Sequence, residues 1–129
     1  MTLNHLNLTV PDPIETSTFL ARHFDLRAGG GNAGMQVLHD DQGMVLTLIK
    51  ARLEDLESAA AAAGEEPAPA VRYPSSFHIG FIQPSRERVN EINERLRQDG
   101  VRVEPASEQH GAWTFYFRAP GGFTIEVMG

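Results

Sequence analysis

Three residues of this sequence carry side chains that commonly bind metal ions: His5, His78 and Glu126. Two imidazole nitrogens and one carboxylate form a ligand set that leaves coordination positions open for water, oxygen or a substrate. A divalent cation held in this way would polarise a substrate oxygen or lower the pKa of bound water. The ligand types alone are compatible with Fe²⁺, Mn²⁺, Zn²⁺ and Ni²⁺ and do not choose among them.

Strand periodicity predicts that each of these three residues lies on the polar face of its strand. Apolar and polar side chains alternate over residues 3–10, so His5 lies on the face opposite the apolar one. The same alternation over residues 76–82 and in the C-terminal strand places His78 and Glu126 opposite apolar faces that suit packing under a helix. A lone strand histidine is more often a hydrogen-bonded structural residue, and an exposed glutamate is usually just solvated. The metal-site prediction therefore depends on the three residues together.

The elements that must position these residues occur in the same order in both halves of the chain. In the first half, Asp12 and Pro13 suit the start of a helix that we expect to run to about Phe24. In the second half, Ser85 opens a helix that Gly100 is placed to end. The strands expected beyond those already described lie near residues 35–39, 44–49, 101–103 and 114–117.

An internal repeat of about 70 residues follows from this order. It aligns His5 with His78, and Thr47 with Glu126. We therefore predict one domain over residues 1–129, with module one at 1–50 and module two at 75–129. Between the modules, residues 51–64 contain strong helix formers and predict a surface helix, and proline-rich residues 65–74 predict a linker.

Composition excludes several functional classes. The chain has 129 residues, 41% of them hydrophobic and 22% charged, which is typical of a soluble globular protein. A net charge of -6 argues against binding nucleic acid, which requires a basic surface. The chain has no cysteine, so disulfides, thiolate ligands and a cysteine nucleophile are excluded. Neither a signal peptide nor a membrane-spanning stretch is predicted, and we expect a cytoplasmic location.

Three segments carry a resemblance to a known family. They are residues 3–10 (LNHLNLTV), 77–81 (FHIGF) and 115–127 (FYFRAPGGFTIEV). The last segment is the most specific, because it looks like a closing hairpin in which an aromatic strand, a proline-glycine turn and a strand with a glutamate follow one another. Together these segments resemble the vicinal oxygen chelate superfamily, which includes glyoxalase I, extradiol dioxygenases, fosfomycin-resistance enzymes and bleomycin-resistance proteins.

The resemblance implies an α+β fold. Two βαβββ modules would form an open U-shaped sheet around a cup for a metal or ligand, with the helices on the outer face. His5, His78 and Glu126 would hold the metal in this cup. The resemblance also implies a homodimer with shared sites, in which His5 of one subunit would act with His78 and Glu126 of the other. The expected partner is a small molecule.

One departure from the family pattern concerns residue 47. Glyoxalase I enzymes typically have a fourth, carboxylate ligand at this place, and Thr47 is a poor ligand. The sequence therefore favours a metalloenzyme with dioxygenase, isomerase or thiol-transferase chemistry over a true glyoxalase I. The alternative is a metal-free, drug-sequestering protein of the bleomycin-resistance type, in which aromatic residues would hold a planar ligand.

Further polar and aromatic residues are predicted to line the cup. Tyr116 could orient a substrate or donate a proton, and Arg118 could hold a carboxylate or phosphate. A tyrosine packed at the rim and an arginine in a surface ion pair are at least equally compatible with the sequence. The other candidates for substrate contacts are Asn7, Thr9, His39, Thr47 and Trp113.

Overall fold

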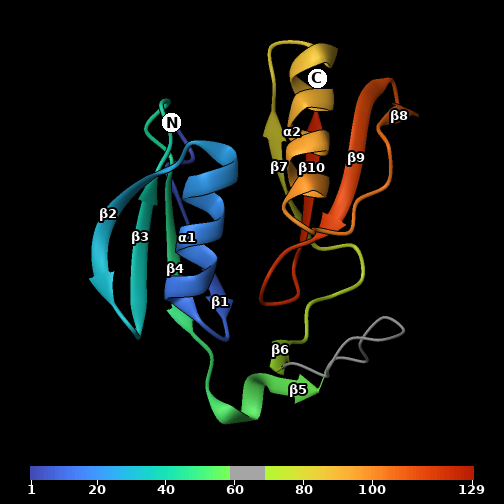
Figure 1. The fold of residues 1–129 in the computed structure, drawn as a ribbon. Coiled ribbons are helices and arrows are strands. Elements are labelled where there is room, and N and C mark those ends of the chain that lie inside the picture. Colours follow the sequence, from blue (N-terminus) through green and yellow to red (C-terminus); the bar gives the residue numbers. More distant parts are fainter. Residues whose placement is uncertain (59–68) are drawn as a thin grey trace. The chain divides into compact units, whose positions relative to one another are not determined.

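The computed structural model describes residues 1–58 and 69–129. These residues form two compact units. The first unit comprises Met1–Tyr73 with Pro120–Gly122, and the second comprises Pro74–Ala119 with Phe123–Gly129. Each unit contains one helix and one four-stranded sheet, so the expected α+β class with two βαβββ modules is confirmed (Figure 1).

The first unit has the element order β1, α1, β2, β3, β4. Its sheet has the strand order β1-β4-β3-β2, with β1 and β4 parallel and the other pairs antiparallel. Helix α1 packs against β2, β3 and β4, and the core between helix and sheet includes Leu20 of α1 with Leu38 and Leu48 of the sheet. The bounds are β1 His5–Val10, α1 Pro13–Phe24, β2 Arg27–Asn32, β3 Met35–His39 and β4 Val45–Lys50.

The second unit repeats this order as β7, α2, β8, β9, β10. Its sheet has the equivalent strand order β7-β10-β9-β8, again with the first pair parallel. Helix α2 packs on β9 and β10 over a core that includes Ile92, Leu96 and Phe115. The bounds are β7 His78–Ile82, α2 Arg86–Gln98, β8 Ser107–Gln109, β9 Ala112–Arg118 and β10 Thr124–Met128.

Both helices begin where the sequence predicts. The Asp12 side chain accepts a hydrogen bond from the Glu15 amide, with Pro13 in the first turn. The Ser85 hydroxyl accepts one from the Arg88 amide. These contacts satisfy amide groups that have no partner inside the helix. Neither α1 nor α2 has the length and apolar character that a bilayer crossing requires.

Two element predictions are wrong. Residues 101–103 form no strand, because the Val101 amide bonds the Leu96 carbonyl at the end of α2 and the Asn93 side chain bonds the Glu104 carbonyl. The helix expected over residues 51–64 is also not seen in its described part.

The segment after β4 instead forms a single 3-10 turn at Leu53–Asp55 and the strand β5 at Leu56–Ser58. Strand β5 pairs with β6, Pro69–Val71, within the segment that was expected to be a linker. Ala70 and Val71 are buried, so this pairing and burial outweigh the local helix propensity. Residues 59–68 lie outside the described part of the chain.

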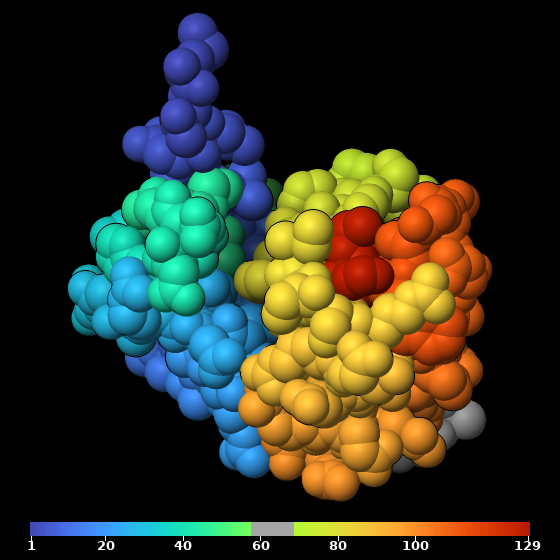
Figure 2. Space-filling view, turned by 90° about the horizontal axis from the view of Figure 1, so that it is seen from above, coloured from blue at the N-terminus to red at the C-terminus, as the bar shows by residue number. Residues whose placement is uncertain are grey.

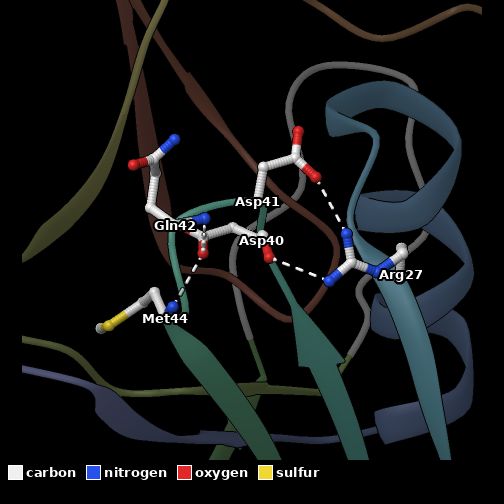
Figure 3. A network of polar contacts seen from close by, with 5 residues as sticks. All are labelled: Arg27, Asp40, Asp41, Gln42 and Met44. Atoms are coloured by element: carbon white, nitrogen blue, oxygen red, sulfur yellow. Dashed lines mark hydrogen bonds and ion pairs between the residues drawn. The ribbon is translucent and has the colours of Figure 1, made fainter.

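A polar network fixes the turn between β3 and β4 in the first unit (Figure 3). The Asp40 carboxylate accepts hydrogen bonds from the amides of Gln42 and Met44. The Arg27 guanidinium pairs with the Asp41 carboxylate at 2.9 Å and also bonds the Asp40 carbonyl. This network holds the end of β3, where His39 lies. The N-terminal segment of the chain, dark blue in Figure 2, projects from the surface.

Candidate metal centre

The sheet of the second unit presents different side chains on its two faces. On the helix side, Phe115, Phe117, Ile125 and Val127 are buried. Because side chains alternate along a strand, the residues between them lie on the opposite face. This second face is called the open face here; its nine positions form three rows across β7, β10 and β9. The rows are His78, Thr124 and Arg118; Gly80, Glu126 and Tyr116; and Ile82, Met128 and Thr114.

His78 and Glu126 meet on this open face. His78 Nε2 lies 3.3 Å from Glu126 Oε2. The other ring nitrogen, Nδ1, lies 3.0 Å from the carbonyl oxygen of Ser76. A carbonyl oxygen can only accept, so Nδ1 carries the hydrogen, and in a neutral ring Nε2 then presents a lone pair. A lone pair and a carboxylate therefore face one another, and only a proton or a cation between them would make this contact favourable.

Glu126 is the more enclosed member of the pair. Its side chain is 14% exposed, compared with 42% for His78. The Thr114 hydroxyl lies 3.0 Å from Glu126 Oε1. A hydrogen bond with Glu126 is the main cause that raises the pKa of Tyr116, followed by burial and the charge of Glu126. The Tyr116 ring also contacts the His78 ring edge-on, with centroids 5.7 Å apart.

The donor atoms present fit a divalent cation. Protein nitrogen and oxygen ligands lie about 2.0–2.2 Å from Zn²⁺, so at the tetrahedral angle two ligands of one ion are roughly 3.3–3.6 Å apart. The 3.3 Å between His78 Nε2 and Glu126 Oε2 lies in this range. The hydrogen bond from Nδ1 to a backbone carbonyl is also the arrangement that orients metal-binding histidines.

His5 lies on β1 in the first unit, whereas His78 and Glu126 lie in the second unit. Its Nδ1 lies 2.8 Å from the Asn4 side-chain oxygen, which leaves Nε2 as the acceptor, as in His78. Within residues 1–58 and 69–129, no three His, Asp or Glu side chains form a group that could hold a metal ion. The three-ligand set therefore stays a prediction.

The open face of the first unit has the same three rows with different residues. They are His5, Val45 and His39; Asn7, Thr47 and Val37; and Thr9, Ile49 and Met35. Four of the predicted substrate contacts, Asn7, Thr9, His39 and Thr47, thus share this face. Thr47 occupies the position that Glu126 has in the second unit, as the sequence repeat indicates. The His39 ring lies over Gly29, where an added Cβ would be only 2.6 Å from His39 Nε2.

The remaining predicted residues on β9 lie on different faces. Arg118 is on the open face, in the same row as His78. Trp113 is on the helix side: its indole donates a hydrogen bond to Asn90 of α2, and Arg86 lies 5.2 Å from the ring centre. The prediction that Trp113 lines the same surface as Tyr116 is therefore corrected. Trp113 is three positions from Tyr116 and two from Phe115, so by strand alternation it shares the face of Phe115.

Thr114 and Ser76 are contacts of the site to which the sequence alone gave no role. For Thr114 a signal was present, because it is two residues from Tyr116 and so must share its face. For Ser76 no such signal exists, because it contributes a backbone carbonyl that any residue type would supply.

Comparison with known proteins identifies the family. Residues 2–127 match the family model for the Glyoxalase/Bleomycin resistance protein/Dioxygenase superfamily. The chain belongs to this superfamily. It is 42% identical to a possible glyoxalase from Bacillus cereus, with 100% of this chain and 99% of that chain covered and a TM-score of 0.81. No curated protein matches the chain.

Two solved structures with named activities have the same fold. Lactoylglutathione lyase from Agrobacterium tumefaciens is 21% identical, covers 98% of this chain and 92% of its own, and has a TM-score of 0.71. The fosfomycin resistance protein FosX from Listeria monocytogenes is 20% identical, covers 99% and 92%, and has a TM-score of 0.72. At these identities the likeness shows the shared superfamily fold alone.

Proposed function

We propose that this chain is a metalloenzyme in which His78 and Glu126 hold one divalent cation, with His5 as the third protein ligand. The observation that carries the proposal is the 3.3 Å approach of His78 Nε2 to Glu126 Oε2, two groups that both offer electron pairs when the imidazole is neutral. Fe²⁺, Mn²⁺, Zn²⁺ and Ni²⁺ all accept this combination of ligands. A cation bound there would supply Lewis acidity toward an oxygen of a small substrate.

The proposed role of Tyr116 is to hold a proton near the reacting substrate. Its hydroxyl bonds Glu126, and this bond raises the pKa of Tyr116, so the phenol stays neutral well above neutral pH. A neutral phenol can donate a hydrogen bond or a proton to a substrate oxygen. Arg118, in the row of His78, is proposed to bind an anionic group of the substrate.

The first unit is proposed to supply the remaining substrate contacts. Asn7, Thr9 and Thr47 offer neutral hydrogen-bonding groups, and His39 adds an imidazole. Since Thr47 stands where glyoxalase I enzymes have a carboxylate, the proposed chemistry is of the dioxygenase, isomerase or thiol-transferase type.

Elemental analysis of protein purified without chelator or metal-affinity tag tests the proposal. We expect about one metal ion per chain, and loss of that ion in His78→Ala and Glu126→Ala. His110→Asn is the control, because His110 lies in the exposed turn between β8 and β9 and asparagine tolerates its positive φ of 51°. Metal retained in both alanine variants would refute the assignment, and wild-type protein without metal would favour the metal-free binding protein.

The proposed homodimer with shared sites has its own test. Neither His5→Ala nor Glu126→Ala should bind metal alone at wild-type stoichiometry. If the ligands come from two subunits, a mixed dimer of these variants contains one site with both substitutions and one with neither. The isolated mixed dimer should then hold about half of the wild-type metal content, whereas sites contained within one chain would give no recovery.

A further inference from the structure

Thr114 is a buried polar residue next to the proposed metal ligand. It lies on β9 and is 1% exposed. Its Oγ1 is 3.0 Å from Glu126 Oε1 and 2.9 Å from the carbonyl oxygen of Val127. A hydroxyl has one hydrogen, and both neighbours are acceptors, so Thr114 shares this hydrogen between them. The bond to the backbone fixes the hydroxyl at the point where it meets the carboxylate.

The two oxygens of Glu126 consequently have different surroundings. Oε1 contacts the hydroxyl of Thr114, while Oε2 lies 3.3 Å from His78 Nε2. In a site this enclosed, a carboxylate oxygen that loses its donor cannot readily find water in its place. Tyr116 also hydrogen-bonds Glu126, so the orientation of the carboxylate depends on two hydroxyls, and Thr114 is the one that holds Oε1.

We infer that Thr114 is a positioning residue: it holds Oε1 and thereby presents Oε2 of Glu126 beside His78 as a one-oxygen metal ligand. This inference rests on the proposed function. Outer contacts of this kind orient ligands, and their loss typically weakens metal binding by about 10–100-fold. A carboxylate that offers only one oxygen also disfavours Ca²⁺, which takes six to eight oxygen ligands and often binds carboxylates through both oxygens.

The first unit provides an internal comparison. The strand registers match Thr47 with Glu126, Val37 with Tyr116, and Met35 with Thr114. In the first unit, where Thr47 replaces the carboxylate, the positions that match Tyr116 and Thr114 hold apolar residues. The Thr114 hydroxyl thus occurs in the repeat that has a carboxylate to hold and not in the repeat that lacks one.

The test is a Zn²⁺ titration of metal-free protein in competition with a chromogenic chelator. Thr114→Val should lower Zn²⁺ affinity by about 10–100-fold, and Thr114→Ser should keep it within a few-fold of wild type. Thr16→Val is the matched control: Thr16 is also 1% exposed but lies on α1, so its loss should leave Zn²⁺ affinity unchanged. If Thr114→Val does not fold, Thr114→Ala compared with Thr114→Ser isolates the same hydroxyl.

A spectroscopic measurement separates positioning from a general loss of structure. The visible absorption of a bound Co²⁺ ion reports its coordination geometry. We expect this spectrum to change in Thr114→Val and to be restored in Thr114→Ser. Wild-type affinity in Thr114→Val, or an equal loss in Thr114→Ser, would overturn the role of Thr114 alone. Wild-type protein that binds no Zn²⁺ would overturn the proposed function and this inference with it.

Discussion

Replacing Glu126 with glutamine should stabilise the metal-free protein while abolishing metal binding. The Thr114 hydroxyl donates toward Oε1, so the carbonyl oxygen of the new amide should take that position. Its NH₂ group would then lie in the place of Oε2, 3.3 Å from His78 Nε2 in the native geometry. Two facing acceptors would be replaced by a donor and an acceptor.

The size of this effect follows from the new contact with His78, with the Tyr116 hydroxyl keeping a hydrogen bond to the amide oxygen of residue 126. One hydrogen bond contributes about 0.5–1.5 kcal/mol to stability. For a chain of 129 residues, about 1 kcal/mol corresponds to a rise in Tm of roughly 3–5 °C. In the presence of metal at about 100 times its Kd, wild-type protein should gain about 2.7 kcal/mol, and Glu126→Gln should gain nothing.

The assay is thermal unfolding at pH 8, with chelator and then with Zn²⁺. Glu108→Gln is the control, because Glu108 pairs with Arg86 at 2.7 Å on an exposed surface and its neutralisation can only weaken that ion pair. A metal-free Glu126→Gln protein with a lower Tm than wild type would refute the reasoning about the two facing acceptors. A Zn²⁺-dependent rise in its Tm equal to that of wild type would refute the ligand assignment.

Three further predictions concern the fold that supports the site. Tyr73, whose hydroxyl bonds the Thr9 carbonyl, has a pKa raised by burial to about 12. The folded state thus keeps a proton that the unfolded chain loses from about pH 10, so this residue's contribution to stability is complete below pH 10 and declines from pH 10 to 12. Urea unfolding should show that Tyr73→Phe is less stable by about 1 kcal/mol at pH 7 and that this difference shrinks above pH 10; a constant difference would contradict the shift. Trp113→Phe should lose about 1 kcal/mol of stability, because the hydrogen bond from the indole to Asn90 is lost. Its metal content should not change, because the indole lies on the helix side. Reduced metal content would show that Trp113 contributes to the metal site. Gly121→Ala should lower the urea midpoint by an amount equivalent to about 1–2 kcal/mol, since φ at Gly121 is +95°, and an unchanged midpoint would show that this turn relaxes.

Periodicity predicted most of the architecture because the relevant signals are local. Alternation placed His78 and Glu126 on the face opposite the buried phenylalanines, and the residues Asp12 and Ser85 marked the helix starts. The strand β2, Arg27–Asn32, was not predicted, because half of its residues are glycine and none is buried. Its pairing with β3 is a tertiary effect that leaves no hydrophobic pattern in the sequence.

The meeting of His78 and Glu126 could be predicted from the sequence, but the contacts that support them could be predicted less well. Residue type and repeat position were enough to select His78 and Glu126. The hydrogen bond from Thr114 to Glu126 depends on the strand register, which alternation alone does not fix. The face of Trp113 follows from alternation with Phe115, but its contact with Asn90 of α2 depends on how the helix packs on the sheet, which the sequence does not give.

The matching rows of the two open faces also have a consequence for protein engineering. The first unit is the matched place in which to rebuild the residue set of the second open face, since His5 already stands where the second unit has His78. Thr47→Glu would add the carboxylate, Val37→Tyr and Met35→Thr would add its two hydroxyl partners, and Asn7→Gly would clear the space that Gly80 provides in the second unit. Four substitutions would thus give the first open face the same residues as the second at these positions.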